Sequence, residues 1–358
     1  MFYFLFYKLL KIVLFKYITF RSIYASITAM VIGFLLYPWF EEKLKNLQFK
    51  QKIKEYLPET HKKKNVPTMG GLLIITSLIL SIFLWNNLEN LFIWLVIFVL
   101  VSFGAIGLVD DYIKSKRSNP EGLSEGKKFF FQLIFASFVA VVLYKSGFST
   151  ELYFPIFKNL HFNLGWLFIP WAVFIIVGAS NAVNLTDGLD GLAIGPVITT
   201  SSVFLVFSYV AGNAKLSSYL HIPHVPGAGE LTIVCAAIIG ASLAFLWFNT
   251  YPAEVFMGDV GSLSLGALLG TIAVLTKEEF ILAIAGGIFV LETVSVIIQR
   301  YYFKYTKRKY GKGKRIFRMA PLHHHFEKKG WEEPKITVRF WIISVILALI
   351  ALSMLKIR

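Results

Sequence analysis

Long apolar runs dominate this sequence and restrict the folds open to it. A helix that crosses the hydrocarbon core of a bilayer needs about 17–25 mostly apolar residues. Ten runs approach that length, at residues 22–40, 70–88, 91–109, 129–145, 164–183, 192–211, 231–248, 260–276, 280–300 and 338–356. Only 16% of the residues are charged, too few to cover a water-soluble globule. The sequence predicts an all-α polytopic membrane protein, one domain over residues 1–358, with about ten transmembrane helices.

The segment before the first run, residues 1–18, predicts an interfacial helix. Lys8 and Lys11 share one face of that helix, and Phe and Leu side chains fill the other. A signal peptide would place its charge before the apolar stretch and a small-residue cleavage site after it, and neither is found. Cys235, the single cysteine, lies inside an apolar run and predicts a core position with no disulfide within the chain.

The positive charge, formally +15, is distributed unevenly between the two predicted faces of the membrane. Loops after the odd-numbered runs hold 24 Lys and Arg residues, whereas the loops after the second, fourth, sixth and eighth runs hold 4, counting Lys145 at the end of the fourth run. The positive-inside rule assigns the first set to the cytoplasm and both termini to the periplasm. We expect the basic loops to face anionic lipid, with no nucleic-acid partner.

Polar clusters that stand out in the sequence all fall on the predicted cytoplasmic side. The clusters are Lys62–Lys64 with Thr68, Gly70 and Gly71; Asp110 and Asp111; Asn181, Asn184, Asp187 and Asp190; Asn249, Glu254 and Asp259; and His323, His324 and His325. Because these stretches are far apart in sequence but share one side, they predict an active-site cleft that faces the cytoplasm.

Carboxylates in these clusters suggest a particular chemistry. Acidic residues at the end of an apolar span are costly unless they bind something, although for any single residue helix capping explains an Asp or Asn equally well. A diphosphate bound through Mg²⁺ requires several carboxylates, and flanking cations neutralise the remaining charge. Gly258 and Gly261 beside Asp259 would permit close backbone approach to such an anion. Neither GxxxxGK[ST] nor GxGxxG after a strand occurs, so soluble nucleotide-binding folds are not indicated.

The remaining features have simpler structural explanations. Three consecutive histidines do not match a zinc-site spacing, so contact with phosphate or nucleotide is the favoured interpretation. Glu292, inside the run 280–300, is expected to pair with a neighbouring helix. Gly286–Gly287, earlier in the same run, are expected to kink this span. The Gly266 and Gly270 spacing predicts close helix packing.

Five sequence blocks carry a resemblance to a known family. They are PTMGG at 67–71, GLVDDYIK at 107–114, NAVNLTDGLDGLA at 181–193, FNTYPAEVFMGDVGSLSLG at 248–266 and MAPLHHHFEKKGW at 319–331. In this order they resemble the polyprenyl-phosphate N-acetylhexosamine-1-phosphate transferases over nearly the whole chain. The APLHHHFE segment points to the branch that uses a muramoyl-pentapeptide donor.

The resemblance implies a reaction, a cofactor and a location. Undecaprenyl phosphate would attack the β-phosphate of UDP-N-acetylmuramoyl-pentapeptide, giving UMP and lipid I in the first membrane step of peptidoglycan synthesis. The resemblance also implies Mg²⁺, a homodimer in the bacterial inner membrane and a broken ninth span.

The same resemblance implies roles for individual residues. Asp259 would ligate Mg²⁺, and Asp110 and Asp111 would lie beside the acceptor phosphate. Contacts to the nucleotide or its diphosphate are implied for Lys63, Thr68, Asn184, Asp187, Asp190, Asn249, Phe256, His323, His324 and His325. A phosphate monoester has a second pKa of about 6, so much of the acceptor is already dianionic at pH 7. We therefore favour Asp110 as a positioning group over Asp110 as a general base.

Two alternatives stay open at this point. A relative of the same family would use UDP-N-acetylglucosamine instead. A secondary transporter would also have about ten spans, but its carboxylates should lie near the bilayer midplane between related halves, and no such repeat is seen here.

Overall fold

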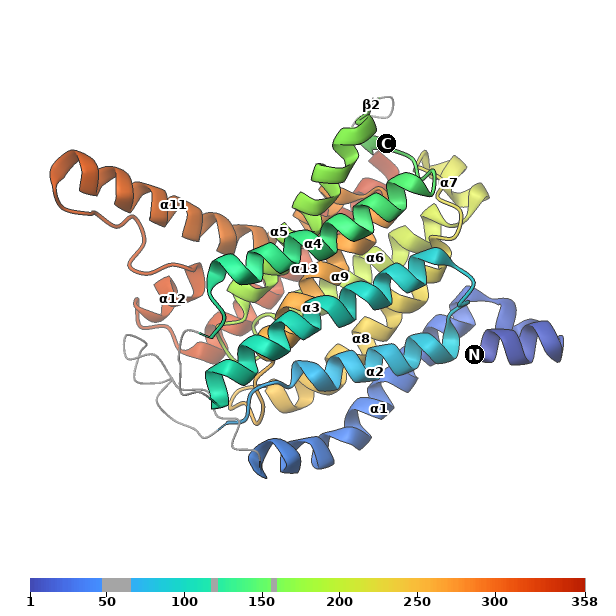
Figure 1. The fold of residues 1–358 in the computed structure, drawn as a ribbon, viewed down its shortest axis with the longest axis horizontal. Helices are drawn as coiled ribbons and strands as arrows, with labels where there is room; N and C mark the ends of the chain where they lie inside the picture. The colour runs from blue at the N-terminus through green and yellow to red at the C-terminus, as the bar shows by residue number, and fades with distance from the viewer. Residues whose placement is uncertain (47–65, 117–121, 156–159, 358) are drawn as a thin grey trace.

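The computed structural model describes residues 1–46, 66–116, 122–155 and 160–357, and it is almost entirely helical (Figure 1). The long helices are α1 (Ile18–Asn46), α2 (Gly71–Trp85), α3 (Leu91–Lys116), α4 (Glu125–Lys145), α5 (Phe168–Thr186), α6 (Ile194–Ala211), α8 (Gly229–Asn249), α9 (Gly258–Thr276), α11 (Gly287–Tyr310) and α13 (Glu333–Ile357). Shorter elements are η1 (Tyr3–Leu9), η2 (Val13–Lys16), η4 (Gly165–Leu167), α7 (Ala214–Leu220), α10 (Glu279–Ala285), α12 (Leu322–Glu327) and the antiparallel pair β1 (Glu151–Tyr153) and β2 (His161–Asn163).

Each of the ten predicted apolar runs falls on helix, which confirms a polytopic all-α membrane protein. Within the described residues, eight helices are long and apolar enough to cross a membrane, and α10 with α11 would form a ninth span bent by 83°. The bend occurs at Gly286, as the Gly286–Gly287 pair predicted. Helix α2, with 15 residues, is apolar but shorter than a typical span. The count of ten stays a prediction.

Helix α9 forms the centre of the bundle, and every residue from Val260 to Thr276 is buried. Small side chains let its neighbours approach closely. A Cβ at Gly266 would lie 2.5 Å from the Ala179 carbonyl oxygen of α5, and one at Gly270 would lie 2.9 Å from Ile176 Cα. The predicted packing role of these two glycines is confirmed, and it fixes α5 against α9. Cys235 is fully buried in α8, as predicted.

The N-terminal segment is not one continuous helix over residues 1–18. Lys11 has φ +55, which ends the first helical segment before the second begins at Val13. Lys8 lies 2.5 Å from Glu89 in the turn between α2 and α3. The interfacial position of this segment stays a prediction.

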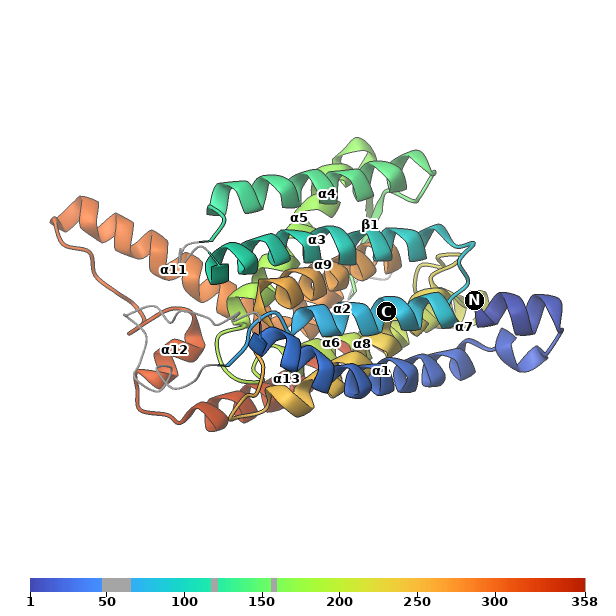
Figure 2. The same cartoon turned by 60° about the horizontal axis from the view of Figure 1, so that its bottom comes forward.

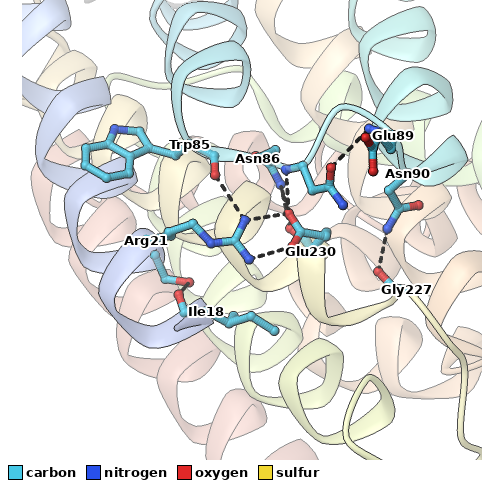
Figure 3. A network of polar contacts seen from close by, with 10 residues as sticks. Ile18, Arg21, Trp85, Asn86, Glu89, Asn90, Gly227 and Glu230 are labelled. Atoms are coloured by element: carbon cyan, nitrogen blue, oxygen red, sulfur yellow. Dashed lines mark hydrogen bonds and ion pairs between the residues drawn. The ribbon is translucent and has the colours of Figure 1, made fainter. Parts of the chain in front are cut away.

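At the end of the bundle near the N-terminus, a buried polar network joins α1, α2 and α8 (Figure 3). The Arg21 guanidinium contacts both oxygens of Glu230, with Nη1–Oε2 2.9 Å and Nη2–Oε1 2.7 Å. Arg21 also donates to the Trp85 carbonyl, and the Asn87 backbone N–H donates to Glu230. The Arg21–Glu230 ion pair is thus hydrogen-bonded to backbone groups at the end of α2 and in the α2–α3 turn. Holding this turn against α1 and α8 explains why these two charges are largely buried.

The opposite end of the bundle carries α11 and α12, which extend beyond the other helices in both views (Figure 1 and Figure 2). Helix α11 continues to Tyr310, so the predicted histidine-containing loop over 303–335 is helical at both ends and includes α12. The carboxyl end of α3 and the amino end of α9 lie at this same end of the molecule.

The orientation of the bundle gives a direct prediction. A cysteine at Lys312 should react with an impermeant thiol reagent only in inside-out vesicles, and a cysteine at Ser218 only in right-side-out cells, because the basic loops are expected in the cytoplasm. Both positions are exposed, and buried Cys235 supplies little background. Labelling with the opposite sidedness would move every polar cluster described above away from the cytoplasm.

Candidate functional site

Three aspartates from two helices form the centre of the candidate site. Asp110 and Asp111 lie in the last two turns of α3, and Asp259 lies in the first turn of α9. One oxygen from each carboxylate lies within 4.8 Å of the others. The two helices approach closely because position 107 has no side chain: a Cβ at Gly107 would lie 2.3 Å from the Asp259 carbonyl oxygen. The structure thus brings together the three residues that the resemblance assigned to the metal ion and the acceptor phosphate.

Two lysines neutralise part of this negative charge. Lys114 Nζ lies 2.5 Å from Asp110 Oδ2 and 3.3 Å from Asp259 Oδ2. Lys128 Nζ, from the first turn of α4, lies 2.8 Å and 2.6 Å from the same two oxygens. The result is a compact arrangement of alternating charges in which each lysine bridges α3 to α9.

Both oxygens of the Asp110 carboxylate have partners. Its Oδ2 faces both lysines, while its Oδ1 accepts a hydrogen bond of 2.7 Å from the Leu123 backbone N–H. Gly122 has φ +63, and a Cβ there would lie 2.5 Å from Asp110 Oδ1, so glycine is needed for this approach. These contacts make Asp110 a rigid element of the site.

Helix α5 supplies the next predicted residues. Asn184 Nδ2 donates to Asp259 Oδ1 at 3.1 Å and to Ser262 Oγ at 2.8 Å, which orients the Asp259 carboxylate. Asp187 follows the last residue of the helix, outside the apolar span. Burial, together with the carboxylates of Asp259 and Asp111, raises the pKa of Asp187 to about 8.

Asp190 and Asn249 connect two loops of the site. Asp190 Oδ2 accepts from the Ala253 backbone N–H at 2.8 Å. Asn249 Oδ1 accepts from the Gly191 N–H at 3.0 Å, and its Nδ2 donates to the Val255 carbonyl at 2.7 Å. In this structure both side chains position the loops after α5 and α8 instead of projecting freely.

The segment before α2 pairs with the segment before α9. The Phe256 N–H donates to the Pro67 carbonyl at 2.9 Å, and the Gly70 N–H donates to the Phe256 carbonyl at 2.8 Å. Thr68, buried in this pairing, lies beside Gly258, where a Cβ would be 3.0 Å from Thr68 Oγ1 and 2.4 Å from Asp111 Oδ2. Thr68 therefore lies at the edge of the carboxylate cluster. Lys63, also predicted here, lies outside the described residues.

The three histidines make three separate sets of contacts. His324 Nδ1 lies 2.6 Å from Glu327 Oε2. His325 Nδ1 accepts from the Arg318 backbone N–H at 3.0 Å, and burial together with nearby Lys329 and Arg318 lowers the pKa of His325. Among the described residues, the group of acidic, histidine and cysteine side chains close enough to share an ion is the aspartate trio. The histidines therefore gain no support as a zinc site.

His323 is buried and held by Glu292 of α11. Glu292 Oε1 lies 3.1 Å from His323 Nδ1, and the Glu292 carboxylate also accepts from the backbone N–H groups of Leu322 and His323 at 2.5 Å and 3.2 Å. His323 Nε2, with no hydrogen-bond partner, points at Gly188, where a Cβ would lie 2.3 Å away. A carboxylate only accepts, so Nδ1 carries the proton and Nε2 faces the loop that follows Asp187.

Comparison with known proteins supports the resemblance. The profile of glycosyl transferase family 4 matches residues 92–277. The phospho-N-acetylmuramoyl-pentapeptide-transferase of Citrifermentans bemidjiense is 59% identical over 354 residues, covering 98% of this chain and 97% of its own. Proteins with the same name from a Geobacter species and Pelobacter propionicus are 58% and 55% identical, each over at least 95% of both chains. The chain belongs to the phospho-N-acetylmuramoyl-pentapeptide-transferase family. This confirms the predicted branch and does not favour the transporter or the UDP-N-acetylglucosamine alternative.

Two cations of the site in this phospho-N-acetylmuramoyl-pentapeptide-transferase family member, Lys114 and Lys128, were not singled out from the sequence. Lys114 had a usable signal, because a lysine four residues after Asp110 shares its helix face. Lys128 had no such sequence signal, since its partners, Asp110 and Asp259, lie on other helices. Glu292 was expected to pair with a neighbouring helix, and its contacts with Leu322 and His323 at the start of α12 confirm this.

Proposed function

We propose that this protein transfers phospho-N-acetylmuramoyl-pentapeptide from UDP-N-acetylmuramoyl-pentapeptide to undecaprenyl phosphate. An oxygen of the acceptor phosphate forms a bond to the β-phosphorus of the donor, and the bond from that phosphorus to the bridging oxygen breaks. The products are UMP and lipid I. The observation that carries the proposal is the aspartate trio bridged by Lys114 and Lys128 at one end of an apolar bundle.

The donor set of the trio fits a hard divalent cation. Mg²⁺ prefers a few carboxylate oxygens and completes its shell with water and substrate phosphates. Asp259 would hold the ion, with Asp110 and Asp111 beside it. When bound, Mg²⁺ would neutralise charge on the diphosphate and so stabilise the departing UMP.

The chain's own cations would act on the phosphates as well. Phosphoryl transfer relies on positioning and on charge neutralisation. Lys114 and Lys128 are held by Asp110 and Asp259 at fixed points, so each presents an ammonium group without first having to be ordered. A dianionic acceptor phosphate needs no base, which leaves Asp110 to hold these lysines in place.

The remaining predicted residues would surround the donor. Asn184 would act through Asp259, and Asp190 and Asn249 through the loops that they connect. Direct contact is proposed for Asp187, Thr68, Phe256 and Lys63. His323, His324 and His325 would close the site from α12.

The proposed setting is the bacterial inner membrane, with both termini in the periplasm and the site facing the cytoplasm, where UDP-sugars are found. A homodimer is proposed from the family resemblance. The test of the function is UMP release by purified protein with undecaprenyl phosphate, Mg²⁺ and either UDP-N-acetylmuramoyl-pentapeptide or UDP-N-acetylglucosamine. Release with the second donor alone, or with neither, would contradict the proposal.

Glu292 gives a prediction about how His323 is positioned. Glu292→Ala should lower kcat for UMP release by about 10- to 100-fold, by analogy with the loss of a carboxylate that orients a metal-bound histidine. Glu292→Gln should have an intermediate effect and a different pH–rate profile, because an amide can donate to Nδ1 and so stabilise the other tautomer.

A matched control for Glu292 is Glu332→Ala, an exposed carboxylate close to α12 in sequence. It should keep wild-type kcat. If Glu292→Gln and Glu292→Ala both keep the wild-type pH profile and kcat, His323 is not positioned through Glu292.

A further inference from the structure

A cationic cavity lies beside α12 and has no role in the chemistry described above. It has a volume of about 750 Å³ and lies between α11 and the segment that follows it. Gln299 pins that segment to the helix: its Oε1 accepts from the Ile316 and Phe317 N–H groups at 3.0 Å each, and its Nε2 donates to the Phe317 carbonyl at 3.2 Å. The cavity therefore has a wall held in place by hydrogen bonds.

Positive charge and apolar surface together define the chemistry of this cavity. Its charged lining residues are all cationic: Arg300, Lys304, Lys307, Arg315, Arg318 and Lys328. Val296, Phe303, Met319 and Ala320 provide apolar surface among them. Positive-inside charge explains basic residues on an exposed loop, but it does not explain why they surround a concave space. Like charges gathered in this way favour an anionic ligand, and arginine binds carboxylate in a bidentate manner.

The wall of the cavity is continuous with the proposed donor site. The Arg318 N–H donates to His325 Nδ1, and Arg318 Nη1 donates to the Lys328 carbonyl at 2.8 Å, so Arg318 ties the cavity to the C-terminal half of α12. Ala320, which lines the cavity, is three residues from His323, a span of at most about 11 Å. His323 in turn faces Gly188, next to Asp187.

We propose that this cavity binds the peptide part of the donor through its carboxylate groups. The inference rests on the proposed function, because the peptide is attached to the sugar whose phosphate is transferred. A linear peptide ends in a carboxylate, and five extended residues reach about 17 Å, enough to extend from a sugar beside α12 into the cavity. A volume of this size is typical of sites for small ligands. Recognition here would make the enzyme select donors by their peptide.

The test compares two donors and two kinds of variant. Lys304→Gln and Arg315→Gln each remove one cation from the cavity, and Lys312→Gln removes one exposed cation from outside it. With the natural donor, each cavity variant should raise the donor KM about 10-fold and leave kcat unchanged, because the peptide contact is equally strong in the ground and transition states. Lys312→Gln should leave KM unchanged.

The second donor carries a carboxamide in place of the terminal carboxylate of its peptide. With it, wild-type enzyme should already show the raised KM, and the cavity variants should add little. Cavity variants with the KM of the Lys312→Gln control, or an equal loss with both donors, would overturn the proposal. A loss that depends on the fraction of anionic phospholipid in nanodiscs, and not on the donor, would instead assign the cavity to a lipid headgroup. A wild-type protein that releases no UMP from either donor would contradict the proposed function itself.

Discussion

Asp259→Asn should reduce kcat for UMP release by at least about 100-fold while leaving the protein folded, and Asp259→Ala should abolish it. The Asp259 carboxylate contacts three other polar residues of the site, Lys114, Lys128 and Asn184. The asparagine variant keeps the size of the side chain but removes the charge that a hard cation and two ammonium groups require. UMP release at saturating substrates and the thermal unfolding midpoint measure the two effects.

The matched control for Asp259 is Glu89→Gln, which removes a carboxylate paired with Lys8 at the other end of the bundle. Exposed pairs of this kind contribute little, so this variant should keep wild-type turnover. Wild-type turnover by Asp259→Asn at ordinary Mg²⁺ concentrations would remove Asp259 from the metal site.

Much of the fold could be predicted because lipid imposes a simple rule. Backbone groups in hydrocarbon must be hydrogen-bonded within their own helix, so apolar length alone locates the spans. The run at 280–300 was also expected to break, because Gly286–Gly287 interrupts it. The break within residues 1–18 was harder to predict, since the positive φ of Lys11 is a local backbone conformation that hydropathy does not indicate.

The centre of the site could be predicted for a related reason. Once the spans alternate, Asp110, Asp111 and Asp259 must lie at the same end of the bundle, and Gly107 of α3 and Gly258 of α9 allow these two helices to pack closely. The sequence offers a signal for Lys114, four residues after Asp110, but none for Lys128. Lys128 reaches the trio only because α4 begins beside the end of α3, which is a property of tertiary packing.

The residues around the centre show where sequence reasoning ends. Asp190 and Asn249 lie in recognisable blocks, but the block does not reveal that their side chains bond to loop backbone. Glu292 lies inside an apolar helix, and nothing in its neighbours predicts that a segment 30 residues later will place His323 against it. Such contacts depend on how a long connection folds back.

Asp110→Asn should lower kcat by about 100-fold at every pH between about 6 and 9. The structure supports a positioning role, because Asp110 Oδ2 contacts both lysines and Oδ1 accepts from the Leu123 N–H. An asparagine would keep the second contact but would lose the charge that holds two ammonium groups together. Raising the pH deprotonates the acceptor phosphate, whose second pKa is about 6, but does not restore the negative charge lost at position 110.

A double-mutant cycle separates the two possible roles of Asp110. If Asp110 acts by holding Lys128, then Lys128→Gln should itself lower kcat, and the double variant Asp110→Asn/Lys128→Gln should lose less than the product of the single losses, because both substitutions disrupt one unit. If Asp110 is instead the base, the losses should multiply, and the single Asp110→Asn variant should approach wild-type activity at alkaline pH, where the acceptor is already deprotonated. Recovery to within a few-fold of wild type at about pH 9 would establish proton removal as its function, and the contacts to Lys114 and Lys128 would then serve only to orient that base.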